Sequence, residues 1–439
     1  MHNRLMKNFF IFLSLIATTS ASDVDKPNIV LIMADDLGYY DLSCYGHPNI
    51  KTPVLDNMAK EGARLLSFYS GNTVCTPSRM GLLSGSYPSR LGWTQGVIGY
   101  KISTKQGMSP KVVTMAEVFK ENGYKTAICG KWHLGDLEKF LPQSQGFEHS
   151  YFIKKSNNQS RKLYRNKELL ENPFENRLLT EKFTNEAKSF IKQNKDNPFF
   201  LYIPYTAPHF PVEAHPDWKG KSDFGEYGDV VEEMDSRIGE IFQVINESDL
   251  DKKTIVIFMS DNGPQGGEKS QSIPFRGKKW SALEGGNRVP CIVRWPEVVP
   301  AGTEINKMVA SIDFFPTLTH ICGINLPKEF PDGQVIDGVN VWGTFTSQKN
   351  FNHPRNELLL WHGMNGLHAI RRGKWKLFID PKGTQLKDLK EPVALFNLED
   401  EKNEMTDLSL KHPEKVQELK KLAEEIKRKI NAKKIELGQ

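Results

Sequence analysis

The stretch Asn28-Ile29-Val30-Leu31-Ile32-Met33-Ala34 is apolar on both faces from Ile29 onward and is followed directly by Asp35 and Asp36. A strand that is apolar on both faces is typical of the centre of a parallel sheet covered by helices. Two more apolar runs, 199–203 and 254–260, have the same character. Helical patterns separate these runs, so the sequence predicts an α/β fold with a large, mostly parallel central sheet flanked by helices.

The segments between the strands include one well-marked helix. Thr114 and Glu117 form a capping box at its start, and Gly123 suits the position after its last turn. Further patterns predict helices over 54–66, 180–194 and 227–246, and a strand over 125–129.

The pattern changes after residue 345. Residues 368–379 alternate between apolar and polar side chains, which predicts a half-exposed antiparallel strand with 394–398 as its partner. Residues 413–435 have a long, charged, amphipathic helical pattern. We therefore expect a large α/β domain over 23–345 and a smaller C-terminal α+β domain over 346–439, with a short antiparallel sheet and a long terminal helix.

The N-terminus predicts export. Arg4 and Lys7 precede a short apolar run at 9–17 and then small residues, which is the pattern of a secretory signal peptide over 1–22. The run is too short to span a bilayer comfortably, and no later apolar run is longer. A periplasmic or secreted, bacterial protein without a membrane anchor after cleavage is expected. Sequons at Asn158 and Asn246 leave a eukaryotic secretory origin open.

The composition limits the partners. A net charge of +5 over 439 residues is too small and too evenly spread for a nucleic-acid-binding protein, although it is compatible with an anionic substrate. The chain has 5 cysteines, and an odd number in an exported protein indicates one thiol with a separate role. No spacing resembles a disulfide framework or a zinc site, and the sequence does not indicate the oligomeric state.

Polar residues follow each predicted central strand. Ligands of open α/β sheets bind beyond the carboxyl ends of the strands, so these residues should meet at one edge. Their oxygen donors would suit Ca²⁺ or Mg²⁺, and three carboxylates would repel one another without a cation. Their cationic groups would suit a tetrahedral oxyanion. The residues are Asp35 and Asp36, Lys131 and His133, His209, and Asp261 and Asn262.

A second motif is Cys75-Thr76-Pro77-Ser78-Arg79. Pro77 suits the first turn of a helix, which places Cys75 just before the helix N-terminus, where backbone N–H groups favour an anion. Arg79 follows about one turn later. By itself this motif is better explained by a buried cysteine and a surface arginine.

Together with other motifs, however, it resembles the formylglycine-dependent type I sulfatases of the alkaline-phosphatase-like superfamily. The resemblance runs from residue 27 to the C-terminus in the family's order. It rests on Cys75–Arg79 with Leu83-Ser84-Gly85, on Gly123–Leu134, on Ala34–Gly38, on Ser260–Gly263 and on Glu284-Gly285-Gly286.

The resemblance implies that Cys75 is oxidised to Cα-formylglycine (3-oxoalanine) by a formylglycine-generating or anaerobic sulfatase-maturating enzyme. The hydrated aldehyde would attack sulfur and form a covalent sulfate intermediate. Asp35, Asp36, Asp261 and Asn262 would bind Ca²⁺, or alternatively Mg²⁺, together with residue 75. Arg79 and Lys131 would hold residue 75, His133 would act as the base, and Lys131, His209 and Lys279 would contact the sulfate. Lys279 is preferred to Lys278 because it lies five residues before Glu284.

The expected substrate is a sulfate monoester of a carbohydrate, with galactose or N-acetylgalactosamine units in an oligosaccharide or polysaccharide. Fold-level analogy alone suggests these sugars. One alternative is a phosphodiester or phosphonate ester hydrolase of the same superfamily. Another is a non-catalytic protein that binds sulfated glycans, although such a protein should have lost ligands or the nucleophile.

Overall fold

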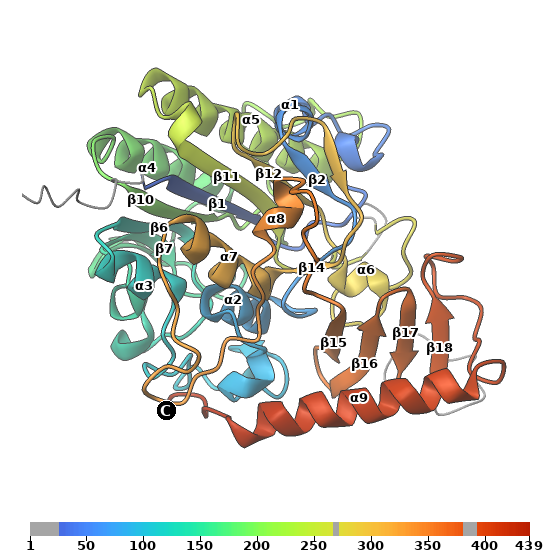
Figure 1. The fold of residues 1–439 in the computed structure, drawn as a ribbon. Helices are drawn as coiled ribbons and strands as arrows, with labels where there is room; N and C mark the ends of the chain where they lie inside the picture. Colours follow the sequence, from blue (N-terminus) through green and yellow to red (C-terminus); the bar gives the residue numbers. More distant parts are fainter. Residues whose placement is uncertain (1–25, 267–271, 381–392) are drawn as a thin grey trace, which may run out of the picture.

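The computed structural model describes residues 26–266, 272–380 and 393–439. The predicted signal peptide over 1–22 lies outside these residues. Within the described ranges, no helix has the length and apolar character needed to cross a membrane. A large sheet with helices on both faces forms most of the molecule, and a small sheet with one long helix lies beside it (Figure 1).

The large sheet has ten strands, and its five central ones are parallel, as predicted. All residues of β1 (Asn28–Ala34) are buried, and this strand pairs with β10 on one side and β11 on the other. In sheet order the strands are β13 (Thr303–Ile305), β2 (Ala63–Leu65), β12 (Cys291–Arg294), β11 (Thr254–Ser260), β1, β10 (Phe199–Pro204), β6 (Lys125–Lys131), β7 (His149–Ile153), β8 (Leu163–Arg165) and β9 (Glu168–Glu171).

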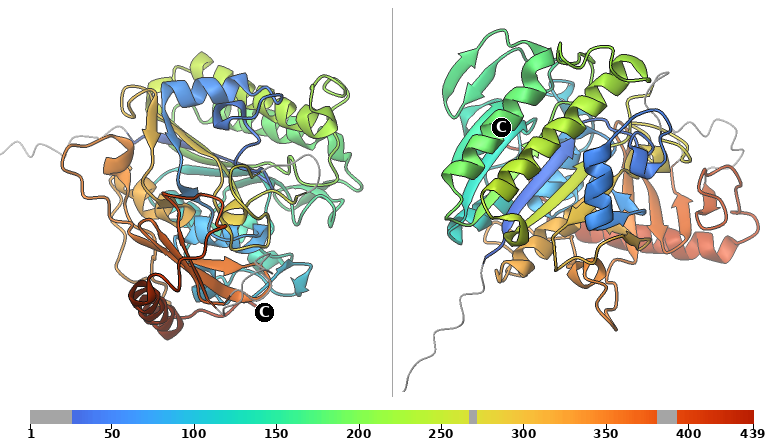
Figure 2. Two further views of the ribbon diagram at one scale, coloured as in Figure 1. Left: turned by 90° about the vertical axis from the view of Figure 1, so that its right-hand side faces the viewer. Right: turned by 90° about the horizontal axis from the view of Figure 1, so that it is seen from above.

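Helices cover both faces of this sheet. One apolar cluster joins the sheet to α1 (Pro53–Glu61), α4 (Leu179–Gln193) and α5 (Gly225–Glu247), which lie together over one face in Figure 2. A second apolar cluster on the opposite face includes α2 (Cys75–Ser84), α3 (Met115–Glu121) and α7 (Phe314–Ile321). The predicted capping box of Thr114 and Glu117 is present at α3.

Two sequence-based element predictions were wrong. The helix predicted over 54–66 ends at Glu61, because Gly62 interrupts it and residues 63–65 join the sheet as β2. The close approach of the Val293 carbonyl leaves no room for a side chain at Gly62. The strand predicted over 368–379 is a hairpin, since Gly373 turns the chain with a φ of +55°.

That hairpin belongs to a four-stranded antiparallel sheet near the C-terminus. Its order is β15 (Glu357–His362), β16 (Gly366–Arg372), β17 (Trp375–Phe378) and β18 (Ala394–Asn397). The predicted partner segment, 394–398, pairs with β17. Helix α9 (Pro413–Ala432) runs along this sheet with Val416 and Leu419 buried (Figure 1). The fold class is therefore as predicted, while the division at residue 345 stays a prediction.

A buried charged cluster joins the two sheets, and we call it the junction cluster. Lys376 on β17 contacts Glu284 Oε1 at 2.9 Å and Glu404 Oε1 at 2.7 Å. Glu284 Oε2 accepts a hydrogen bond from the Tyr69 hydroxyl at 2.5 Å, and Glu404 Oε2 accepts one from the Glu284 backbone N–H at 2.7 Å. All its side chains are buried: Tyr69, Glu284, Arg288, Arg371, Lys376 and Glu404.

Candidate active site

Helix α2 presents Cys75 to the carboxyl edge of the large sheet. The helix begins at Cys75 itself, one to two residues earlier than Pro77 suggested, and every residue from Cys75 to Ser84 is buried. Gly85 ends the helix with a φ of +66°, and a Cβ there would lie 2.9 Å from the Phe315 ring. The packing on all sides fixes the position of Cys75.

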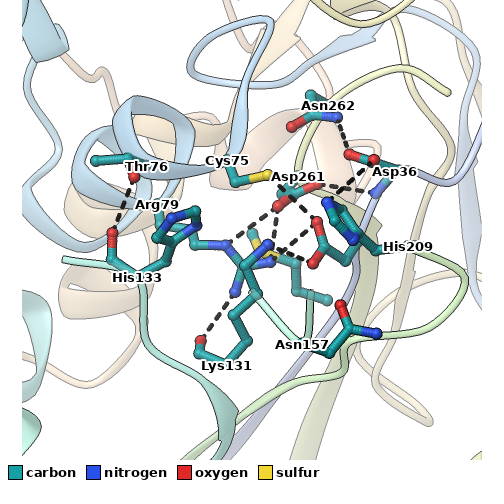
Figure 3. A network of polar contacts seen from close by, with 12 residues as sticks. Asp36, Cys75, Thr76, Arg79, Lys131, His133, Asn157, His209, Asp261 and Asn262 are labelled. Carbon is teal, nitrogen blue, oxygen red and sulfur yellow. Dashed lines mark hydrogen bonds and ion pairs between the residues drawn. The ribbon is translucent and has the colours of Figure 1, made fainter. Parts of the chain in front are cut away.

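The predicted polar strand ends meet at this edge. Since β1, β10, β6 and β11 are parallel, the residues after them lie together, and Figure 3 shows them around Cys75. We call this set the strand-end cluster, and all its members are buried: Asp35, Asp36, Cys75, Arg79, Lys131, His133, His209, Asp261, Asn262 and Lys279.

Two members hold unusual backbone conformations. Asp36 has a φ of +64° and His133 a φ of +61°. Non-glycine residues rarely adopt this left-handed region, and such conformations persist only where the surroundings enforce them. For Asp36, one enforcing contact is its backbone N–H, which donates to Asp261 Oδ1 at 3.1 Å.

Three cations and three carboxylates form three close pairs in the strand-end cluster, and Arg79 Nη2 also lies 3.7 Å from Asp35 Oδ1. Lys131 Nζ lies 2.5 Å from Asp35 Oδ2, and Lys279 Nζ lies 2.7 Å from Asp36 Oδ1. Arg79 donates to Asp261 Oδ2 from Nε at 3.1 Å and from Nη2 at 2.7 Å. Because these groups are buried, removing one partner would leave a charge that nothing compensates.

The Cys75 sulfur lies between both kinds of charge. Sγ is 3.4 Å from Asp35 Oδ1 and 3.4 Å from Lys279 Nζ. Burial, aided by the negative charge of Asp35, raises the pKa of the thiol to about 12. An unmodified Cys75 is therefore protonated at neutral pH and a weak nucleophile, since the thiolate is the reactive form.

The oxygen donors of the cluster fit a hard divalent cation. Ligand atoms of Asp35, Asp36, Cys75 and His209 lie within 4.8 Å of one another. Asn262 Oδ1 is buried and has no hydrogen-bond partner among the described residues, as expected of an oxygen reserved for a cation.

The placement of Asp261 and His209 differs from the simplest expectation. Asp261 lies outside the close group because its carboxylate is taken by Arg79 and the Asp36 backbone. His209, expected at the sulfate, is inside that group, with Nε2 3.7 Å from Asp36 Oδ2.

The two histidines have defined tautomers. His133 Nε2 lies 3.1 Å from the Ile98 carbonyl, which can only accept, so Nε2 carries the proton and Nδ1 is a free base. Nδ1 has no partner in the part of the chain that the structure describes. Burial, together with Lys131 and Arg79, holds the pKa of His133 well below its usual value, which keeps the ring neutral.

His209 is bonded through the other ring nitrogen. Its Nδ1 lies 2.7 Å from the Phe210 carbonyl and carries the proton, so Nε2 faces the cluster. Burial lowers the pKa of His209 to about 4, against the opposing effect of Asp35 and Asp36.

The choice between the two adjacent lysines is clear in the structure. Lys279 is buried in the strand-end cluster, whereas Lys278 is exposed. The backbone N–H of Lys279 donates to the Pro264 carbonyl, and that of Trp280 donates to the Thr73 carbonyl, two residues before Cys75. These bonds hold the lysine loop against the start of α2.

Sequence reasoning missed two residues at this site. Thr76 Oγ1 donates to the His133 carbonyl at 3.0 Å and accepts from the Ile98 N–H at 3.2 Å, so it ties α2 to the histidine loop. Asn157 follows β7, a strand that was not predicted, and Figure 3 shows it beside the cluster. Thr76 lies within the quoted motif, but nothing in the motif indicated its hydrogen bonds, and Asn157 in a polar segment has no distinguishing pattern.

The fold and the cluster define a class. A parallel sheet whose strand ends combine hard oxygen donors with lysine, arginine and histidine is built to bind a tetrahedral oxyanion and hydrolyse its ester.

The chain belongs to the sulfatase family, since the profile described as Sulfatase matches residues 27–324. A second profile, described as N-sulphoglucosamine sulphohydrolase, C-terminal, matches residues 277–434. The protein is a sulfuric ester hydrolase, which confirms the resemblance stated from the motifs and favours the sulfatase over the alternatives considered there.

Several relatives cover nearly the whole chain. An N-acetylgalactosamine-6-O-sulfatase of Bacteroides thetaiotaomicron is 31% identical over 92% of this chain and 93% of its own length. The solved structure of the sulfatase PsFucS1 from Pseudoalteromonas has a TM-score of 0.84 at 25% identity, covering 94% and 92% of the two chains. A structure of Ps i-CgsB in complex with k-i-k-neocarrahexaose has a TM-score of 0.78 at 28% identity, covering 91% and 92%.

Proposed function

We propose that this sulfatase is exported and removes sulfate from a carbohydrate with galactose or N-acetylgalactosamine units. The observation that carries the proposal is the position of Cys75, whose sulfur lies 3.4 Å from both Asp35 and Lys279. A nucleophile at this point can contact a cation on one side and an anionic substrate on the other. The names of the relatives support a sulfated sugar.

Residue 75 is proposed to work as formylglycine, made by a formylglycine-generating or anaerobic sulfatase-maturating enzyme. The hydrated aldehyde supplies the attacking oxygen. The raised pKa of the Cys75 thiol agrees with a need for this conversion. Arg79 holds the surrounding carboxylates and, with Lys131, orients residue 75.

Asp35, Asp36, Asp261 and Asn262 are proposed to hold Ca²⁺, or alternatively Mg²⁺, together with residue 75. The unpartnered Asn262 Oδ1 supports this assignment. When bound, the cation would lower the pKa of the attacking hydroxyl and offset the charge of the carboxylates.

The remaining residues handle the sulfate and the protons. Lys131, His209 and Lys279 are proposed to bind the sulfate oxygens, and His209 and Lys279 to stabilise the departing alkoxide. His133 Nδ1, a buried neutral base, would accept the proton that leaves residue 75 when sulfate is released.

The test is sulfate release from a panel of galactose and N-acetylgalactosamine sulfates, measured by ion chromatography, with mass analysis of the peptide containing residue 75. We expect turnover of at least one sugar and residue 75 without its sulfur. Fully active enzyme with an intact Cys75 thiol would refute the nucleophile. N-terminal sequencing of the exported protein tests cleavage after residue 21 or 22.

A further inference from the structure

A fifth strand end reaches the active site and has no role so far. Strand β7 is parallel to β6 and pairs with it up to Lys131 and Ile153. Beyond the strands, the His133 backbone N–H donates to the Lys154 carbonyl at 3.0 Å, so the segment after β7 follows the segment that carries Lys131 and His133. Asn157 lies on this segment and is 3% exposed.

The orientation of the Asn157 carboxamide is fixed by a relay. The Pro211 carbonyl can only accept a hydrogen bond, so Asn176 must turn Nδ2 toward it, at 3.0 Å. Asn176 Oδ1 then faces Asn157, which must present its own Nδ2, at 2.8 Å. This chain of hydrogen bonds uses Asn157 Nδ2, so Asn157 Oδ1 is the atom that it leaves available as an acceptor.

Asn157 Oδ1 is a buried acceptor without a partner among the described residues. In Figure 3 it is turned toward the strand-end cluster, on the side of His209. Leaving such an oxygen unpaired is costly, so a ligand that donates a hydrogen bond there would be favoured.

An exposed aromatic ring lies next to His209. The Phe210 ring stacks on the His209 ring at 4.6 Å with an interplanar angle of 18°, and Phe210 remains 44% exposed. Pro211, whose carbonyl ends the Asn157 relay, is the next residue. An apolar face and a fixed polar group, both adjacent to His209, are what a sugar ring requires, with its C–H face and its hydroxyls.

We infer that Asn157 and Phe210 form the subsite for the sugar ring that carries the sulfate. This inference rests on the proposed function, in which His209 acts at the departing oxygen, because the ring bonded to that oxygen must lie beside His209. Asn157 Oδ1 accepts a hydrogen bond from a hydroxyl or acetamido N–H of the ring, and Phe210 packs on its apolar face.

The test compares Asn157→Ala and Phe210→Ala with wild type on two probes, N-acetylgalactosamine 6-sulfate and p-nitrophenyl sulfate. We expect Asn157→Ala to lower kcat/KM for the sugar roughly tenfold more than for the aryl ester, since only the sugar offers the hydroxyl. Phe210→Ala should lower kcat/KM for both probes, because either ring can pack on Phe210. Leu169→Ala, at an exposed position of β9, is the control and should change neither probe. Phe210 is exposed, so its variant should fold even if Asn157→Ala does not.

Deoxy analogues of the sugar sharpen the test. For one analogue that lacks a single hydroxyl, or the acetamido group, the kcat/KM of wild type should fall by the same factor of roughly ten. The kcat/KM of Asn157→Ala should change little with this analogue. Equal losses on both probes in Asn157→Ala, no loss on either probe in Phe210→Ala, or no analogue that discriminates, would overturn the subsite while leaving the sugar-sulfatase function intact. Turnover of the aryl ester without turnover of galactose or N-acetylgalactosamine sulfates would overturn both.

Discussion

The strand-end cluster and the junction cluster are both buried and highly charged, yet they differ in how completely they are satisfied. In the junction cluster both oxygens of Glu284 and Oε2 of Glu404 accept hydrogen bonds, and Glu404 Oε1, which accepts none among the described residues, is paired with the Lys376 ammonium at 2.7 Å. In the strand-end cluster Asn262 Oδ1 and His133 Nδ1 have none among the described residues. Burying a polar atom without a partner is costly, so the difference separates a cluster that holds the fold from one prepared for a ligand.

The largest expected effect is the loss of activity when the nucleophile, residue 75, is removed from the strand-end cluster. We expect Cys75→Ala to lower kcat by roughly 10⁴-fold or more, because only transition-state binding remains. Its melting temperature should stay close to wild type, since one small buried residue replaces another. Cys129→Ala, in β6, is the matched control and should keep its activity per folded molecule. Comparable activity in Cys75→Ala would assign the strand-end cluster a structural role.

In the junction cluster the large effect should be on stability. Lys376→Met leaves Glu284 and Glu404 without their shared cation and should cost roughly 3–5 kcal/mol in the free energy of unfolding. Urea denaturation measures this loss. The kcat of the folded fraction should fall far less than in Cys75→Ala. A stable variant with a large loss of kcat would reverse the assignment of the two clusters.

Metal removal should have a smaller effect on stability, and this effect should depend on the strand-end cluster but not on the junction cluster. EDTA should abolish activity and Ca²⁺ restore it. Binding to the folded state at about 100 times Kd would add roughly 2.7 kcal/mol of stability. Calorimetry should show that the shift in melting temperature persists in Lys376→Met and disappears in Asn262→Leu. An unchanged melting temperature with and without Ca²⁺ in wild type would argue against the metal.

The smallest predicted effect is a pH dependence of the junction cluster. Burial, and then the nearby Glu284, raise the pKa of Glu404 to about 7 despite Lys376. The folded protein thus holds a proton that the unfolded chain releases near pH 4–5. Stability should therefore fall as the pH rises from 5 to 8, by roughly 2 kcal/mol. Unfolding curves of Glu404→Gln should lack this part of the slope, and parallel curves for both proteins would contradict it.

The sequence was most informative where polar residues follow apolar strands. Asp35 after β1 and Asp261 after β11 lie at one edge because the strands are parallel, and that arrangement follows from the apolar pattern alone. The motif around Cys75 became meaningful only in combination with these strand ends. The family model supports the fold class and sulfate ester hydrolysis, whereas the individual residue roles come from the resemblance of the motifs and stay proposals.

Other features depend on tertiary contacts that no local pattern encodes. The 368–379 hairpin alternates like one strand because both arms share the same period of two, and only Gly373 and Lys374 separate them. Asn157 lies in a polar loop, and its significance arises from a relay through Asn176 to Pro211. Pairings across more than a hundred residues, such as Glu284 with Glu404, are equally invisible in sequence.

The burial of α2 has a consequence for how the protein is made. Cys75 is 1% exposed at the start of a helix that is packed on every side. If residue 75 is converted to formylglycine as proposed, the oxidising enzyme would have to act on the nascent or unfolded chain, because Cys75 is buried after folding. Folding would then set a time limit on the modification, and a molecule that folds unmodified would be inactive. The yield of working enzyme in a cell would reflect this race rather than stability alone.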